Sequence, residues 1–507
     1  MSKKGNSIAK NTIFLYLRML ITLCVTLYTS RVVIAALGII DYGIYNLVAG
    51  VSSSFVFFSA ALSTSTQRFL NFEMGRGNRR RVGEIFSMSV EMYTSLALIV
   101  TVVGVLLGDW LIADKLVIPA DKRPEALVVL YTMLASFCMM LIASVFESAL
   151  IARENMKLYA YLGITDALAK LGIAYAVMCL PDKLITYASL MVVAQLVPYA
   201  IMVIYCLRHY PECRPHWFWN KATFKEMFGF TGWNMYGSII WMFNEQGITM
   251  LLNIFFGPVV NAARGVAASV NAAVNNFATQ FFTAVRPQLV KRYAARQTAE
   301  LISLIFGSTK FTVYLLWLLC LPVMLRVDYI LQLWLKEVPE WTGAFVIWTL
   351  IYTIVNALNN PTYTALSATG RLRRAVLIGC NMFLLAFPLS YVALKCGLPP
   401  MAVYPLLMAG RFAFFLVSVK ELKKYVPVSY SQYAVMIGLP VFKVLSVSLI
   451  VLLPINMLLP QTFPGLTVLV IVSITVCLIA SLWLGVTGAE RQLVIDKVRQ
   501  LIKKFRK

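Results

Sequence analysis

The chain has 507 residues, is 60% hydrophobic and carries a formal net charge of +23. Soluble globular chains are roughly 45–50% apolar, so this composition excludes an ordinary soluble protein and favours one that crosses a membrane many times. The charge does not indicate nucleic-acid binding, because most lysines and arginines fall in the connections that lie on the same side of the membrane as the N-terminus. Inner loops of membrane proteins carry such an excess.

The first two apolar runs predict a transmembrane hairpin. They cover residues 11–37 and 44–67, each long enough for a bilayer core that needs about 20 helical residues. A turn is predicted at 38–43, and a basic loop follows the second run. Arg18 shares one helical face with Thr22 and Thr29, so that face should look into protein or water. Close helix packing for the small polar residues, and snorkelling for Arg18, remain alternatives.

Two stretches of this hairpin resemble a known family. They are the turn LGIIDYGIY at 37–45 and the helix end STSTQRF at 63–69. Both look like bacterial polysaccharide flippases of the Wzx type, in the superfamily that also holds MATE drug exporters and lipid II flippases. The resemblance implies two six-helix lobes around a central cavity. It also implies two extra C-terminal helices.

The remaining runs complete an all-α polytopic membrane protein of about fourteen transmembrane helices. Hydropathy and the alternation of basic and acidic connections place both termini in the cytosol. The predicted spans are 11–37, 44–67, 85–108, 126–151, 160–180, 184–207, 229–256, 262–286, 304–326, 343–367, 376–395, 400–419, 434–456 and 464–486.

This pattern predicts five parts. An N-terminal lobe covers 1–208, and a C-terminal lobe covers 229–419. Between them, 209–228 is rich in Trp, Phe and Lys and predicts a helix on the cytosolic leaflet, with a plain amphipathic linker as the alternative. Residues 420–486 hold helices 13 and 14. The tail 487–507 predicts a basic amphipathic helix on anionic lipid.

Polar residues inside the seventh and eighth predicted helices mark a candidate binding site. Asn234 and Glu245 share one face of the seventh helix, and Arg264, Asn271 and Asn275 share one face of the eighth. Because polar helix faces are unfavourable in contact with lipid, we interpret these two faces as the lining of a water-filled central cavity. Hydrogen bonding between helices is the alternative.

Other ionisable residues lie within apolar runs. Asp166 and Lys170 are four apart and predict an ion pair that faces protein. Arg411 lies near the middle of its helix, and Lys310 near the end of another, where snorkelling is an alternative. Pro361 follows two asparagines and predicts a helix break that could act as a hinge.

The sign of these charges favours an anionic substrate. The deep cations outnumber the deep acids, and guanidinium groups make paired bonds to phosphate oxygens. By resemblance, lipid II flippases use arginines on helices 1, 2 and 8. Arg18 and Arg264 match the first and last, whereas the second-helix arginine is missing unless Arg68 serves.

We therefore predict a flippase that moves undecaprenyl-pyrophosphate-linked oligosaccharides across the bacterial inner membrane by alternating access. It would serve the biosynthesis of a surface polysaccharide such as lipopolysaccharide. Arg18 and Arg264 would hold the substrate's phosphate, and the three asparagines would contact its sugar. Lys170 and Arg411 are further candidates for substrate binding. Glu245 and Asp166 are candidates for ion coupling. Expected partners are the lipid-linked glycan, membrane lipids and glycan-assembly proteins such as a polymerase.

Two other function classes remain open. A MATE-type ion-coupled antiporter of small molecules is the main alternative. A membrane-embedded glycan enzyme is disfavoured, because the connections look too short for a soluble domain. The sequence has no C-x-x-C spacing among its nine cysteines and no phosphate-binding G-x-x-x-x-G-K loop, so we expect no metal, cofactor or nucleotide.

Overall fold

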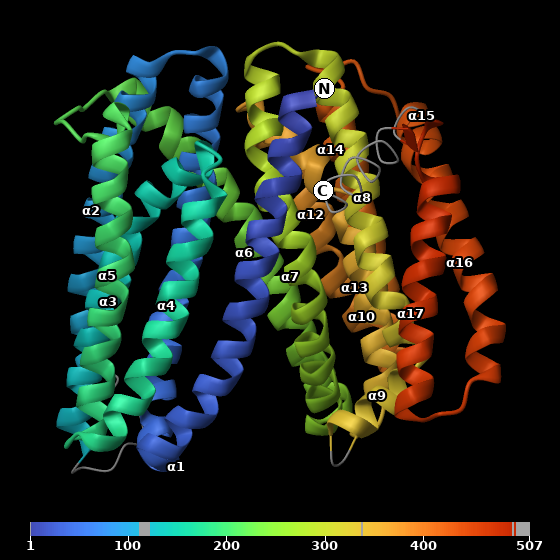
Figure 1. Cartoon of the computed structure of the whole chain (residues 1–507), viewed down its shortest axis with the longest axis horizontal. Helices are drawn as coiled ribbons and strands as arrows, with labels where there is room; N and C mark the ends of the chain where they lie inside the picture. The colour runs from blue at the N-terminus through green and yellow to red at the C-terminus, as the bar shows by residue number, and fades with distance from the viewer. Residues whose placement is uncertain (1, 111–121, 336–337, 489–490, 493–507) are drawn as a thin grey trace, which may run out of the picture. The chain divides into compact units, whose positions relative to one another are not determined.

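Helices make up nearly all of the described chain. The computed structural model describes residues 2–110, 122–335, 338–488 and 491–492, and within these residues it holds no strand (Figure 1). This confirms the predicted all-α polytopic class. The predicted amphipathic helix of the tail falls mostly on 493–507, which lies outside the described residues.

The helices follow one another with short connections. In chain order they are α1 (Ser2–Arg76), α2 (Arg79–Trp110), α3 (Arg123–Ala152), α4 (Met156–Ala176), α5 (Lys183–His209), α6 (Lys221–Phe256), α7 (Pro258–Ala294), α8 (Thr298–Leu325), α9 (Val327–Trp334), α10 (Thr342–Ala357), α11 (Asn360–Ala368), α12 (Arg373–Leu384), α13 (Ala386–Lys395), α14 (Val403–Leu422), α15 (Tyr430–Tyr433), α16 (Leu439–Leu458) and α17 (Phe463–Ala480).

α1 is helical throughout, although the sequence predicts a turn at 38–43. Leu15 packs beside Ile151 of α3, and the Ser63 and Ser148 hydroxyl oxygens lie 3.1 Å apart. In a straight helix residues 15 and 63 would be roughly 70 Å apart, yet both reach the same turn of α3. α1 therefore doubles back, and the chain reverses near the label α1 in Figure 1. The hairpin is confirmed, but its bend keeps a helical backbone.

A charged cluster fixes the bend of α1 to the start of α3. The Lys122 ammonium lies 3.2 Å from an Asp41 carboxylate oxygen and 3.0 Å from one of Glu125. The hydrogen bond that Lys122 donates to Glu125, followed by the one it donates to Asp41, raises the pKa of Lys122 above its usual value. Lys122 thus stays charged at neutral pH and holds the two segments together.

Eleven helices of the described chain are long and apolar enough to cross a membrane. α1 contributes two further passes because it doubles back. The amide-rich α7, with 37 residues, is long enough for another. These passes follow the fourteen predicted spans in order, so the structure is that of a multi-pass membrane protein.

The chain divides into two compact units. Unit 1 comprises Met1–Met235 and Thr283–Arg296, and unit 2 comprises Tyr236–Phe282 and Gln297–Lys507. The division falls within α6 and α7, whereas the sequence predicts it at 209–228. Each of these two helices therefore contributes to both units.

The segment 209–228 forms no separate surface helix. Its last eight residues, 221–228, are the first two turns of α6. Before them the chain is held on α2, where the backbone N–H of Phe218 donates to the Glu91 carboxylate at 2.8 Å. The segment is thus a connection docked within unit 1, and the prediction of a separate interfacial helix is not met.

Helices α16 and α17 pack against α8 within unit 2. The Trp317 ring N–H donates to the Ser448 hydroxyl at 2.7 Å, and the Tyr314 hydroxyl donates to the Gly485 carbonyl at 3.0 Å. A side chain at Gly485 would collide with the Tyr314 ring, because a Cβ there would lie 2.7 Å from it. The two extra C-terminal helices are thus built into the unit by specific contacts.

Candidate functional site

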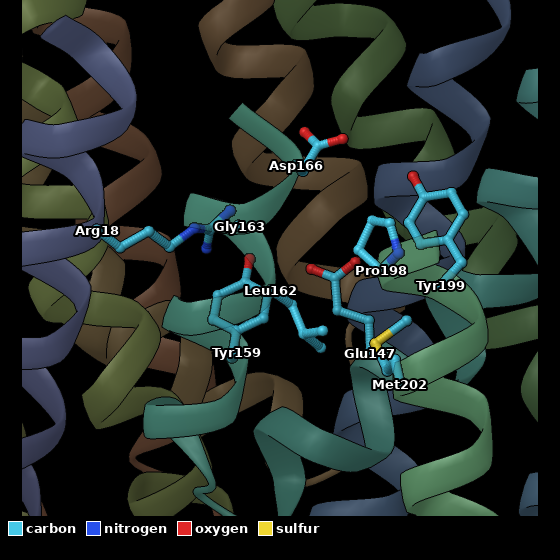
Figure 2. A pocket seen from close by; sticks show the side chains of 9 residues that line it. All are labelled: Arg18, Glu147, Tyr159, Leu162, Gly163, Asp166, Pro198, Tyr199 and Met202. Atoms are coloured by element: carbon cyan, nitrogen blue, oxygen red, sulfur yellow. The ribbon is translucent and has the colours of Figure 1, made fainter. Parts of the chain in front are cut away.

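A polar pocket of about 140 Å³ lies within unit 1 (Figure 2). It is bounded by α1, α3, α4 and α5, so its walls come from one compact unit. The lining residues are Arg18, Glu147, Tyr159, Leu162, Gly163, Asp166, Pro198, Tyr199 and Met202. Three of them carry charges inside apolar helices, which makes the pocket a functional candidate.

Arg18 reaches from α1 across the pocket to α4. Its guanidinium carbon lies 4.1 Å from the centre of the Tyr159 ring, a distance typical of a cation–π contact. Its side chain also lies directly against Gly163, where a Cβ would overlap the Arg18 Nε. Arg18 therefore faces protein and lines this pocket, and its role in a central cavity stays a prediction.

Glu147 faces the same pocket from α3, and Tyr159 lies between it and Arg18 (Figure 2). Tyr159 interacts electrostatically with both residues. Glu147 is not among the site residues predicted from the sequence. The signal that could have singled it out is a lone carboxylate in the largely apolar stretch Ala143–Ala152, five residues before the helix ends.

Asp166 and Lys170 form the predicted ion pair on α4. The Lys170 ammonium donates to the Asp166 carboxylate at 2.7 Å, and each side chain is about one-third exposed. Asp166 lines the pocket, whereas Lys170 pairs beside it. The pocket wall thus holds two carboxyl groups and one guanidinium group, and Lys170 is paired with one of the two carboxyl groups.

A second polar cluster lies within unit 2, where α6 meets α7. The Arg264 Nη2 donates to the Glu245 carboxylate at 2.9 Å and to the Glu245 carbonyl at 3.3 Å. The Arg264 side chain is 11% exposed and that of Glu245 is 27% exposed. The other terminal nitrogen, Nη1, is buried and has no hydrogen-bond partner among the described residues. Arg264 therefore keeps unused donors beside its carboxylate.

Arg411 extends this cluster from α14. Its Nε donates to the Tyr352 hydroxyl of α10 at 3.2 Å, and its guanidinium carbon lies 4.0 Å from the centre of the Phe383 ring. Tyr352 also lies within electrostatic range of Glu245 and Arg264. The structure thus groups two arginines and one carboxylate in unit 2.

The predicted asparagines fall into different environments. Asn271 accepts a hydrogen bond from the Thr353 hydroxyl at 2.5 Å, which connects α7 with α10 in unit 2. Asn275 is exposed. Asn234 is buried in unit 1 and donates to the Phe230 carbonyl of its own helix at 3.0 Å. The structure therefore does not group Asn234 with Asn271 and Asn275 in one unit.

The helix break at Pro361 is present. α10 ends at Ala357 and α11 begins at Asn360, so the proline lies in the first turn of α11, where it displaces no backbone hydrogen bond. Lys310 is 5% exposed and packs inside unit 2, rather than extending outward. The break is confirmed, and its role as a hinge stays a prediction.

Solved transporters share the arrangement of these helices. A MATE transporter in the bent conformation matches with a TM-score of 0.73 at 11% identity, covering 83% of this chain and 95% of that chain. A point mutant of the Vibrio cholerae MATE transporter VcmN matches with 0.71 at 14% identity, covering 83% and 98%. The chain has the MATE fold.

A third match extends the MATE-fold comparison. It is a MOP superfamily transporter from Pyrococcus furiosus, for which a reversed polarity of the binding pocket suggests a different function. It gives a TM-score of 0.67 at 11% identity and covers 84% of this chain and 98% of that chain. No protein-family model and no curated protein matches the sequence. At these identities the likeness shows the MATE fold alone, so the substrate has to be argued from the residues.

Proposed function

We propose that the protein is a flippase for oligosaccharides linked to a polyprenyl lipid through pyrophosphate. The headgroup would cross the bacterial inner membrane through a polar passage, while the lipid tail stays in the bilayer. Alternating access is the expected mechanism for a chain with the MATE fold. Both termini would face the cytosol, and the flipped unit would pass to proteins that assemble a surface polysaccharide.

The observation that carries this proposal is the arginine cluster of unit 2. Arg264 and Arg411 lie well inside apolar helices and are directed toward protein groups. One carboxylate, Glu245, offsets two guanidinium groups, so the cluster keeps one positive charge. A net positive site in a low-dielectric environment favours phosphate oxygens, to which guanidinium groups bond in pairs.

Neighbouring polar side chains could contact the sugar part. The side chains of Asn271 and Thr353 are hydrogen-bonded to each other where α7 contacts α10. Asn275 is exposed one turn further along α7. Amides and hydroxyls both donate and accept hydrogen bonds, which suits sugar hydroxyls. In unit 1, Asn234 and the pocket around Arg18 would add further polar contacts, and Lys170 would contribute through its pair with Asp166.

An ion-coupled antiporter of small molecules, as in MATE transporters, is the second candidate. The unit 1 pocket favours it, because Glu147 and Asp166 place two carboxylates against one guanidinium there. Such a wall would suit a cation or a proton better than a phosphate. The two candidates therefore predict substrates of opposite charge.

The deciding experiment follows the substrate in cells. After depletion of the protein, we expect pyrophosphate-linked glycan units to accumulate on the inner leaflet and the surface polysaccharide to decline. Normal surface glycan together with loss of cation efflux would refute the flippase and support the antiporter.

A matched pair of variants locates the site. Arg264→Gln should abolish glycan flipping in proteoliposomes, because the phosphate loses its paired donors. Arg374→Gln removes one positive charge from an exposed position on α12 and should leave flipping unchanged. Equal activity of the two variants would contradict the assignment of Arg264.

A further inference from the structure

The ion pair of Glu245 and Arg264 occupies the donors that an incoming phosphate would need. Nη2 of Arg264 is bonded to Glu245, while Nη1 is buried without a partner among the described residues. A phosphate that binds both terminal nitrogens has to take Nη2 from the carboxylate. Substrate binding and the ion pair are therefore in competition for one guanidinium.

If Glu245 were displaced from Arg264, its carboxylate would find no other partner in the described cluster. The titratable and charged groups that face it are Arg264 of α7, Tyr352 of α10, and Tyr404 and Arg411 of α14. Arg411 is already placed on Tyr352 and the Phe383 ring. A carboxylate left unpaired in such a partly buried position is costly in its charged form.

The net charge of the cluster also favours protonation of Glu245 when the substrate is bound. Two guanidinium groups and one carboxylate leave the cluster with one positive charge. A pyrophosphate that joins a lipid to a sugar has one ionised oxygen on each phosphorus, so binding it leaves one negative charge. If Glu245 takes a proton from the aqueous solution, the cluster with its substrate becomes neutral.

We propose that substrate and proton binding are coupled at this pair: the pyrophosphate displaces Glu245 from Arg264, and the freed Glu245 takes up one proton. Release of the substrate would let the pair reform and return the proton. This inference rests on the proposed flippase function and adds to it the coupling ion and the residue that carries it. No bond other than the O–H bond of Glu245 is made or broken.

Proton uptake on binding can be measured directly. The probe is a short-chain prenyl pyrophosphate that carries one N-acetylglucosamine, titrated by calorimetry into the full chain in nanodiscs. Its phosphates do not titrate near neutral pH. Titrations in buffers of different ionisation enthalpy should give an uptake of about one proton per ligand at pH 7.5. Correspondingly, Kd should rise up to about tenfold per pH unit.

The variants separate coupling from binding. Glu245→Gln should still bind the probe, with no proton uptake and a Kd that does not change with pH. Glu421→Gln, which breaks the ion pair of Glu421 on α14 with Lys424 in the same unit, serves as the matched control and should keep the uptake of the wild type. The melting temperature of each variant in nanodiscs establishes that it is folded.

Each outcome has one meaning. Binding by the wild type without proton uptake, or uptake that persists in Glu245→Gln, would overturn the coupling and leave the flippase proposal standing. If the folded wild type does not bind the probe, the flippase proposal fails, and the coupling fails with it. Loss of uptake in Glu421→Gln but not in Glu245→Gln would move the coupling away from Glu245 and overturn the inference.

Discussion

Replacing Gly163 by alanine tests whether the position of Arg18 matters. An alanine Cβ would overlap the Arg18 Nε and would lie 2.9 Å from its Cζ and 3.0 Å from its Cδ. These atoms belong to the far end of a flexible side chain, so Arg18 should move while the backbone of α4 stays in place. Its guanidinium would then leave the face of the Tyr159 ring.

The expected magnitudes follow from two opposing effects. A cation–π contact away from water contributes about 1–2 kcal/mol, whereas alanine in place of glycine stabilises a helix by about 1 kcal/mol. Gly172→Ala provides the control, because Gly172 lies on the same helix with open space around it. We therefore expect Gly163→Ala to be less stable than Gly172→Ala by about 1–2 kcal/mol.

Transport should respond more clearly than stability. If the contact of Arg18 with Tyr159 acts in the rate-limiting step, its loss slows transport roughly 5–30-fold. The assay is glycan flipping in proteoliposomes, with Arg18→Ala and the double variant alongside. Because the effect of Gly163→Ala passes through Arg18, it should add nothing to Arg18→Ala. Equal flipping rates for Gly163→Ala and Gly172→Ala would contradict a role for the position of Arg18. Fully additive effects of Gly163→Ala and Arg18→Ala would contradict it as well.

Two further predictions concern the helix break and a buried thiol. Pro361→Ala should let α10 continue into α11 and slow flipping several-fold with little change in Kd; an unchanged rate would contradict a hinge at this break. Burial raises the pKa of the Cys213 thiol to about 12, so at pH 8 it should stay protonated and resist maleimide, while the exposed Cys396 reacts. Mass spectrometry of the labelled native protein measures both sites, and equal labelling would contradict the burial of Cys213.

Local patterns were sufficient to predict much of this fold. The length of the apolar runs gave the order of the spans, because a bilayer imposes a minimum helix length. The spacing of Asp166 and Lys170 predicted their ion pair, since residues four apart lie on one helical face. Pro361 marked its break because proline lacks the backbone N–H that a continuous helix needs.

Features that depend on tertiary contacts were not predictable from one sequence. Glu147 became a pocket residue only because α4 brings Tyr159 against it. Asn234 and Glu245 share a helical face of α6, yet they belong to different units, because the division of the chain passes between them. Periodicity describes which face a residue occupies, but it does not tell which neighbour covers that face. The helical backbone of the α1 bend was not predicted for a related reason: a helix can reverse without a non-helical residue when neighbouring helices hold both arms.

The charge composition of the two units argues for a division of labour. The pocket of unit 1 sets two carboxyl groups against Arg18, with Lys170 paired to one of them, whereas the cluster of unit 2 sets two arginines against Glu245. A single anionic substrate gains more from the second arrangement, and a proton or cation gains more from the first. If both arrangements serve one transport cycle, then removing the positive charge of Arg264 should weaken substrate binding. Neutralising Glu147 should instead leave both the affinity for substrate and the proton uptake on binding unchanged. Because each compact unit encloses its own polar residues, variants of the two units can be compared separately.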